Sequence, residues 1–124
     1  MTTPSYGETL RARPIGLAAM RWRFRQVFGD EAEAGDARIN LVARKDWAGV
    51  APATIALAGI DPLRSEGEAL AEAMEQAGVK VDCWTYEGVV QGFFGLGLVV
   101  TKALFAQSDT ADALGKAFAP ARHS

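Results

Sequence analysis

The pattern that most constrains the fold lies between residues 53 and 86, where three kinds of hydrophobic spacing follow one another. Ala53–Ala58 (ATIALA) is continuously apolar, as in a parallel strand that is buried on both faces. Residues Ser65–Ala77 show helical spacing, and Val79–Tyr86 alternates between apolar and polar, as in a strand near a sheet edge. Strand, helix and strand in this order predict a βαβ unit with two parallel strands and a right-handed crossover. We therefore expect an α/β protein.

The ends of these elements carry their own signals. Gly59 is expected to end the first strand, and residues 61–64 (Asp-Pro-Leu-Arg) to form a turn. Ser65 with Glu68 fits a capping box at the start of the helix. Gly78 is placed to end the helix in a left-handed conformation. The helix should bury Leu70, Ala71 and Met74 and expose Glu68, Glu72, Glu75 and Gln76.

The flanking segments predict a helix at each end of the chain. Residues 16–28 have apolar side chains at helical spacing (Leu17, Met20, Phe24, Val27, Phe28), which indicates an N-terminal amphipathic helix. Residues 38–53 look irregular. From about Leu98 to Phe118 a C-terminal helix is expected, with Ser108 and Asp109 as a candidate interruption. With 124 residues we expect a single domain, 1–124, with a helix and an irregular segment in 1–52 and a βαβα unit in 53–124.

Charge excludes several classes of partner. The formal net charge is −2, which gives no overall attraction to nucleic acid or to anionic lipid. Five arginines fall between Arg11 and Arg25, but helical spacing puts Arg21 and Arg25 on the wet side of the N-terminal helix. Stacking aromatics on a basic strand face are missing, so nucleic-acid binding is not expected. No signal peptide and no apolar run of the roughly 18 residues that span a membrane is present, so we expect a cytoplasmic protein with no membrane partner.

Few residues are available for metal or redox chemistry. Cys83 is the one cysteine, so it forms no internal disulfide and no cysteine-built metal site. Its place in the alternating strand predicts a small core residue rather than a reactive thiol. The one histidine, His123, lies next to the end of the sequence, where a disordered tail is the simpler expectation. We therefore expect no metal and no cofactor.

Two polar residues follow the two predicted strands. Asp61 follows the first strand and Gln91 follows the second. The carboxyl ends of parallel strands meet at one edge of a sheet, where α/β folds place their ligands. The sequence therefore predicts that Asp61 and Gln91 share this edge.

The segment Ala58–Leu96, AGIDPLRSEGEALAEAMEQAGVKVDCWTYEGVVQGFFGL, resembles a known family. Its D-P-L-x-x-E-G turn, helix, strand and x-G-F motif are similar to the C-terminal third of the α/β-hydrolase esterases related to hormone-sensitive lipase. The segment from Ser5-Tyr6 to Ala51-Pro52 resembles the stretch that follows the nucleophile strand in that family. The resemblance implies the C-terminal part of an α/β-hydrolase fold.

The family cleaves esters with a Ser-Asp-His triad in that chain order. The resemblance implies that Asp61 is the remnant of the triad acid, which orients the histidine and stabilises its charged form. Gln91 stands at the histidine position, and an amide cannot accept the proton of a serine near neutral pH. For Asp61 the alternative is an inherited turn residue, and for Gln91 a structural loop residue or a contact to a polar ligand. Phe93 and Phe94 are expected to pack beneath this loop.

The nucleophile and the oxyanion loop are absent too. A G-x-S-x-G elbow needs a glycine on each side of the serine. Ser5 and Ser65 have only the trailing glycine, and neither follows a predicted strand. No H-G-G-G segment is present. We therefore expect a truncated homologue of carboxylesterases and lipases that is inactive alone.

Two other functions stay open. The chain could be one part of a split ester hydrolase that a partner chain completes, or a non-catalytic module that binds a small ligand or another protein. A two-stranded sheet is marginal by itself in water, and its bare edges favour pairing. We expect a homo-oligomer, or a partner chain that covers the sheet edge at 53–58 and the 79–86 strand. The resemblance adds Leu98–Phe118 as a contact surface, because the family often dimerises through its final strand and helix.

Overall fold

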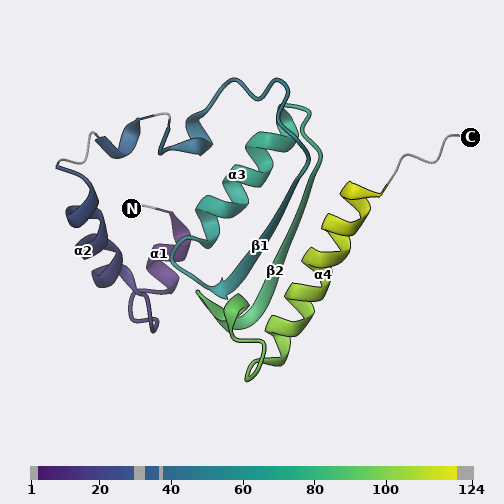
Figure 1. Ribbon diagram of the computed structural model, residues 1–124. Helices are drawn as coiled ribbons and strands as arrows, with labels where there is room; N and C mark the ends of the chain where they lie inside the picture. Colours follow the sequence, from purple (N-terminus) through teal and green to yellow (C-terminus); the bar gives the residue numbers. More distant parts are fainter. Residues whose placement is uncertain (1–2, 30–32, 37, 120–124) are drawn as a thin grey trace, which may run out of the picture. The chain divides into compact units, whose positions relative to one another are not determined.

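The computed structural model describes residues 3–29, 33–36 and 38–119. They fall into two compact units, residues 1–91 and residues 92–124. The first unit contains the sheet and the N-terminal helices, and the second contains the C-terminal helix (Figure 1). The single domain expected over 1–124 stays a prediction.

The centre of the first unit is a βαβ unit. It consists of β1 (Ala53–Ile60), α3 (Arg64–Gln76) and β2 (Val81–Val90). The two strands pair in parallel, with Ala53 opposite Val81, and α3 packs against both of them (Figure 1). The predicted order of strand, helix and parallel strand is therefore confirmed.

Both strands extend further than the sequence predicts. β1 does not stop at Gly59 but continues to Ile60. β2 begins at Val81 rather than Val79, and it continues past Tyr86 to Val90. Glycine usually weakens a strand, but here Gly59 and Gly88 stand at an irregularity in the ladder rather than at its end.

That irregularity is a shift of two residues in the pairing. Ala58 lies opposite Tyr86, whereas Ile60 lies opposite Val90. Gly59 allows the backbone of Glu87 to come close, because a Cβ at position 59 would lie 3.1 Å from the Cα of Glu87. The extra residues in β2 are accommodated at Gly88, whose φ is +74°.

The strands are less buried than expected. Ala58 and Gly59 are buried, but Thr54 is exposed and Ile60 is 39% exposed. Cys83, expected in the core, is also exposed. The expectations of a strand buried on both faces and of a core cysteine are therefore wrong. Hydrophobic patterning shows which side of a strand is apolar, but burial needs neighbours, and the sheet has two strands over the described residues.

Helix α3 is amphipathic as predicted, except at its start. Ala71 and Met74 are buried, Leu70 is half-buried, and the expected acidic and amide side chains are exposed. Gly78 has a φ of +84°, which confirms the left-handed end. The predicted capping box is wrong, because the helix already begins at Arg64 and no side chain of its N-cap residue, Leu63, caps it. A serine from a distant part of the chain caps it instead, as described below.

The N-terminal segment forms a small core of its own. It contains α1 (Pro4–Glu8), which the sequence did not predict, and α2 (Leu17–Val27), which it did. Tyr6, Ile15 and Met20 are buried together. Partly buried residues pack around them: Leu17, Ala19, Phe24 and Leu63. Val27, expected on the apolar stripe, is instead exposed, since it lies at the last turn of α2.

The segment between α2 and β1 is mostly irregular, as expected. Its described residues include the single-turn 3₁₀ helices η1 (Glu33–Gly35) and η2 (Leu41–Ala43). In the second unit, η3 (Phe93–Gly95) precedes α4 (Thr101–Phe118). Gln107 of α4 donates from Nε2 to the backbone oxygen of Phe94, over 2.7 Å. α4 runs without interruption through Ser108 and Asp109, and it starts three residues later than predicted.

Within the described ranges, no helix is both long enough and apolar enough to cross a membrane.

Candidate functional site

The ends of the two strands meet as predicted. The backbone N–H of Gln91 donates to the backbone oxygen of Ile60, over 3.3 Å. Ile60 is the residue before Asp61, so Asp61 and Gln91 leave neighbouring strands at the same edge of the sheet. Both residues are half-buried. The structure thus brings together the two positions that the sequence singles out.

The carboxylate of Asp61 stabilises the turn that leads into α3. Its Oδ1 accepts a hydrogen bond from the backbone N–H of Leu63, over 2.8 Å, which is an Asx turn. Burial raises the pKa of Asp61, and the hydrogen bond from Leu63 opposes that rise. Part of the acceptor capacity of this carboxylate is therefore used within its own loop.

The serine hydroxyls near Asp61 are engaged in structural hydrogen bonds. Ser5 is fully buried, and its hydroxyl donates to the backbone oxygen of Pro62, over 2.6 Å. The same oxygen accepts from the backbone N–H of Ser65 in the first turn of α3, over 3.2 Å. The backbone N–H of Ser5 in turn donates to the hydroxyl oxygen of Ser65, over 3.1 Å. Ser5 therefore provides the cap that the sequence assigned to Ser65, and it fixes α1 to the Asp61 turn.

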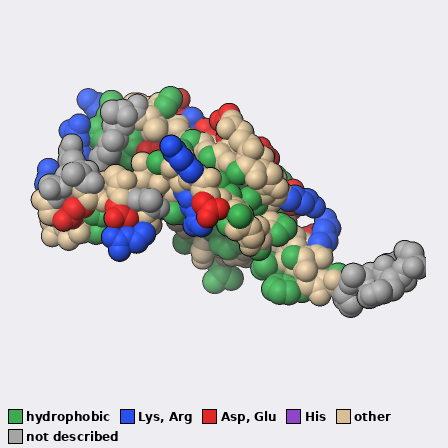
Figure 2. Space-filling model, turned by 90° about the horizontal axis from the view of Figure 1, so that it is seen from above, with side chains coloured by type: hydrophobic (Ala, Val, Ile, Leu, Met, Phe, Trp, Pro, Cys, Tyr) green, Lys and Arg blue, Asp and Glu red, His purple; other side chains and the backbone are tan. Residues whose placement is uncertain are grey.

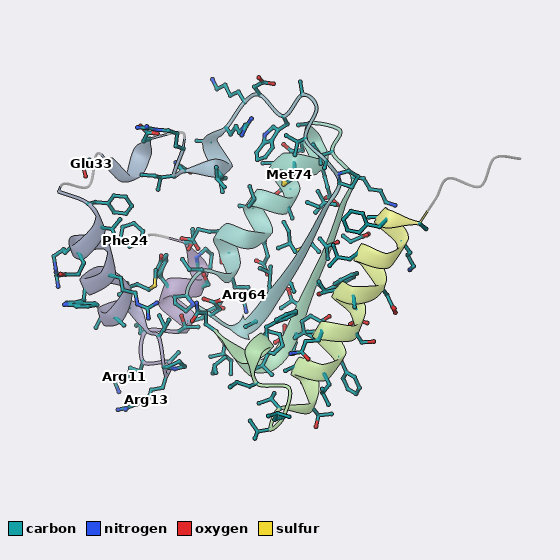
Figure 3. The ribbon with its side chains drawn as sticks, in the orientation of Figure 1. Arg11, Arg13, Phe24, Glu33, Arg64 and Met74 are labelled. Atoms are coloured by element: carbon teal, nitrogen blue, oxygen red, sulfur yellow. The ribbon has the colours of Figure 1, made fainter. Side chains whose placement is uncertain are left out.

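Arg64 provides a second link between α1 and α3. Its guanidinium forms an ion pair with Glu8 of α1 and donates from Nη1 to the backbone oxygen of Gly59, over 3.0 Å. Its Nε lies 3.4 Å from a carboxylate oxygen of Glu68. Figure 3 shows the Arg64 side chain at the start of α3, beside α1. The arginine thus joins the end of β1 to both helices.

Tyr6 adds a buried phenol to the same region. Burial, together with smaller contributions from the nearby carboxylates of Glu66 and Asp61, raises the pKa of Tyr6 to about 12. The phenol is therefore neutral over the physiological range. It offers no proton acceptor that could replace an imidazole.

Within the part of the chain that the structure describes, there is neither a candidate metal centre nor a histidine. Over the described residues, no group of three or more His, Cys, Asp or Glu side chains is arranged to hold a metal ion. His123 lies outside the described residues. The described ionisable groups near this edge include Asp61, Arg64 and Tyr6. The roles of Ser5 and Tyr6 were missed in the sequence because they depend on contacts between segments about 60 residues apart.

Comparison with known proteins identifies relatives of this arrangement. A family model described as alpha/beta hydrolase fold matches residues 1–95. A carboxylic ester hydrolase of Mycobacterium tuberculosis, LipN, is 38% identical over 76 residues, which is 60% of this chain and 20% of that protein. An ethyl acetate hydrolase of Pseudomonas putida is 31% identical over 84 residues, which is 68% of this chain and 26% of that protein.

Solved esterase structures match most of this chain. EstE1, a thermophilic carboxylesterase from a metagenomic library, superposes with a TM-score of 0.87 at 28% identity, covering 95% of this chain and 40% of that one. An esterase of Pyrobaculum calidifontis has a TM-score of 0.86 at 27% identity, over 92% of this chain and 38% of that one. The chain therefore spans about a fifth to a quarter of the curated relatives and about two fifths of these esterases.

Proposed function

The chain belongs to the alpha/beta hydrolase fold family and is homologous to its esterases, and we propose that the 124-residue polypeptide does not cleave esters by itself. The observation that carries this proposal is that position 91 is a glutamine rather than a histidine. Gln91 lies at the carboxyl edge beside the Asp61 turn, where the triad needs a group that accepts a proton. A neutral amide does not accept one near physiological pH.

The hydrogen bonds of the serines support the same proposal. An attacking hydroxyl has to be exposed to substrate and paired with a base. Ser5 is fully buried, and its hydroxyl is bonded to Pro62 and Ser65. The Ser65 hydroxyl accepts from the backbone of Ser5. Among the described residues, neither hydroxyl is hydrogen-bonded to a side chain that could act as its base.

The charge of Asp61 is the remaining part of the triad chemistry. A triad carboxylate stabilises the imidazolium that forms during acyl transfer. With glutamine at position 91, no such cation forms, and Asp61 is left with its turn-forming hydrogen bond to Leu63. We propose that Asp61 acts in this chain as a structural residue. Ester hydrolysis, the activity named for the relatives, would require another protein chain to supply the missing catalytic groups.

The direct test measures hydrolysis of p-nitrophenyl acetate and butyrate by the purified chain and by the Asp61→Ala and Gln91→Ala variants. We expect all three to match the rate of an unrelated protein at equal concentration. A wild-type rate that is well above this background and that falls in both variants would overturn the proposal. A rate well above background that all three share would also overturn it and would show an active site elsewhere.

A fluorophosphonate probe provides an independent readout, because it labels serines that are activated as nucleophiles. We expect no labelling of Ser5 or Ser65. Ser108 of α4, which is exposed, is the reference for non-specific labelling. The same two assays, repeated with a lysate that contains candidate partner chains, test the split-hydrolase alternative. Labelling or hydrolysis that appears only with the lysate, and that Asp61→Ala removes, would favour that alternative over the proposal.

A further inference from the structure

The segment from Thr9 to Gly29 carries five arginines and no acidic residue, so its formal charge is +5 in a chain of net charge −2. The arginines are Arg11, Arg13, Arg21, Arg23 and Arg25, and all five are exposed. None of them forms an ion pair with a residue that the structure describes. Figure 2 shows several blue side chains on the left, the side on which Figure 1 draws α2. We call this set of five the arginine surface.

Apolar side chains accompany these charges. Trp22 of α2 is 57% exposed, and Leu10 in the preceding loop is 53% exposed. At 100° per residue, Arg21, Trp22 and Arg25 share the solvent side of α2, opposite the buried Met20. Figure 3 shows Arg11 and Arg13 extending outward from the loop before α2. Exposed tryptophan together with arginine is the composition of protein–protein interface centres.

The chain itself carries a matching acidic surface. The solvent side of α3 presents Glu68, Glu72 and Glu75, all exposed. Glu68 is near Arg64, but Glu72 and Glu75 form no ion pair with a described residue. Outside the arginine surface the remaining residues carry a formal charge of −7. This excess of negative charge opposes approach to an anionic membrane and favours approach of another copy with its arginines first.

We propose that the arginine surface of one copy of this chain docks on the acidic side of α3 of a second copy. Guanidinium groups form paired hydrogen bonds with carboxylates, so Arg21 and Arg25 suit Glu72 and Glu75 in particular. If the contact is repeated by a two-fold axis, the second copy returns the same contact and the assembly closes as a dimer. The inference concerns a different part of the chain from the Asp61–Gln91 edge and does not depend on the proposed function.

The test is a charge exchange between the two surfaces. We compare the wild type with Arg21→Glu/Arg25→Glu and with Glu72→Arg/Glu75→Arg by sedimentation velocity at about 0.01 M salt, where the Debye length is about 30 Å. The wild type should associate, and each double variant alone should lose about tenfold or more in association constant. An equimolar mixture of the two variants should regain association as a heterodimer. In about 1 M salt, where the Debye length is about 3 Å, the wild type should become monomeric.

The control matched to Arg21→Glu/Arg25→Glu is Lys45→Glu/Lys80→Glu, which makes the same change in net charge at two exposed lysines outside both surfaces. It should associate like the wild type. Circular dichroism and the melting temperature establish that each variant is folded. A monomeric wild type in low salt, or a mixture that fails to associate, would overturn the proposal. So would binding to phosphatidylserine vesicles that Arg21→Glu/Arg25→Glu removes while the wild type stays monomeric, because the occupant would then be a lipid surface.

Discussion

Ser5 and Ser65, which are 60 residues apart in the sequence, form two reciprocal hydrogen bonds. The backbone N–H of Ser5 donates to the hydroxyl oxygen of Ser65, and the backbone N–H of Ser65 donates to the hydroxyl oxygen of Ser5. The helix start that follows Asp61 is thus completed by a residue of α1. Asp61 itself fixes the turn through Leu63. The candidate site is therefore built from two separate parts of the chain.

Replacing Ser5 by alanine should destabilise the fold strongly. The change leaves the backbone oxygen of Pro62 and the backbone N–H of Ser65 without their partner. Each buried polar group left unsatisfied costs roughly 1–3 kcal/mol, so for the two groups we expect a loss of about 2–6 kcal/mol in the free energy of unfolding. Urea denaturation followed by circular dichroism measures it. Ser108→Ala, at an exposed position in α4, is the control; an equal, small effect of both changes would contradict the role of Ser5.

Replacing Asp61 by asparagine should maintain or raise stability near neutral pH. Burial raises the pKa of Asp61 in the folded protein. Above this raised pKa the charged carboxylate therefore destabilises the folded state, and the destabilisation is lost as the pH falls through the raised pKa. Asparagine removes the charge and keeps an oxygen that can accept from Leu63. Urea midpoints should therefore favour Asp61→Asn near neutral pH and converge with the wild type in acid.

Asp61→Ala is the companion to that variant, because it removes the charge and the acceptor together. It should be less stable than Asp61→Asn at every pH. If Asp61→Asn is less stable than the wild type near neutral pH, the charge of Asp61 has a favourable partner and the residue does more than form the turn.

Tyr6 should titrate at unusually high pH. Burial and two nearby carboxylates raise its pKa from 10.0 to about 12. The unfolded chain ionises its phenol first, so stability should fall as the pH rises from about 10 towards 12. In Tyr86→Phe, Tyr6 is the one remaining tyrosine, and its absorbance near 295 nm reports the titration directly. A midpoint at the ordinary value would show that the phenol is solvated.

Restoring an imidazole should not restore esterase activity. Gln91→His supplies the missing proton acceptor beside the Asp61 turn, but the hydroxyls of Ser5 and Ser65 stay engaged in the cap of α3. We expect p-nitrophenyl butyrate hydrolysis by this variant to equal that of Gln91→Asn, the matched control. Hydrolysis that exceeds the control and that Asp61→Asn abolishes would show that a serine of this chain can act as the nucleophile.

The sequence predicts those parts of the fold that depend on local spacing. The period of the apolar residues gives β1, α2, α3 and β2, and the place of Asp61 and Gln91 after parallel strands gives their shared edge. The family resemblance is confirmed by the match over residues 1–95. These features need no knowledge of distant contacts.

Long-range contacts account for what the sequence does not predict. Ser65 has the spacing of a capping residue, but Ser5 competes for the same helix start from another segment. Cys83 lies on the side of β2 that the alternation predicts to be apolar, but it is exposed. The sequence of one strand does not show how many strands and helices cover it. The strand end at Gly59 is misplaced because the pairing continues past an irregularity.

The offset between the two strands has an arithmetic consequence. Side chains along a strand alternate with a period of two, so an even offset preserves which side each later residue faces and an odd one reverses it. Opposite Gly59 the second strand gains two positions rather than one. Losing Gly88 and Val89 as a pair would thus return Gln91 to the same side of the sheet, whereas losing either one would invert it. An insertion or deletion of an odd number of residues at this point would therefore move Gln91 to the other side of the sheet, whichever residues are involved.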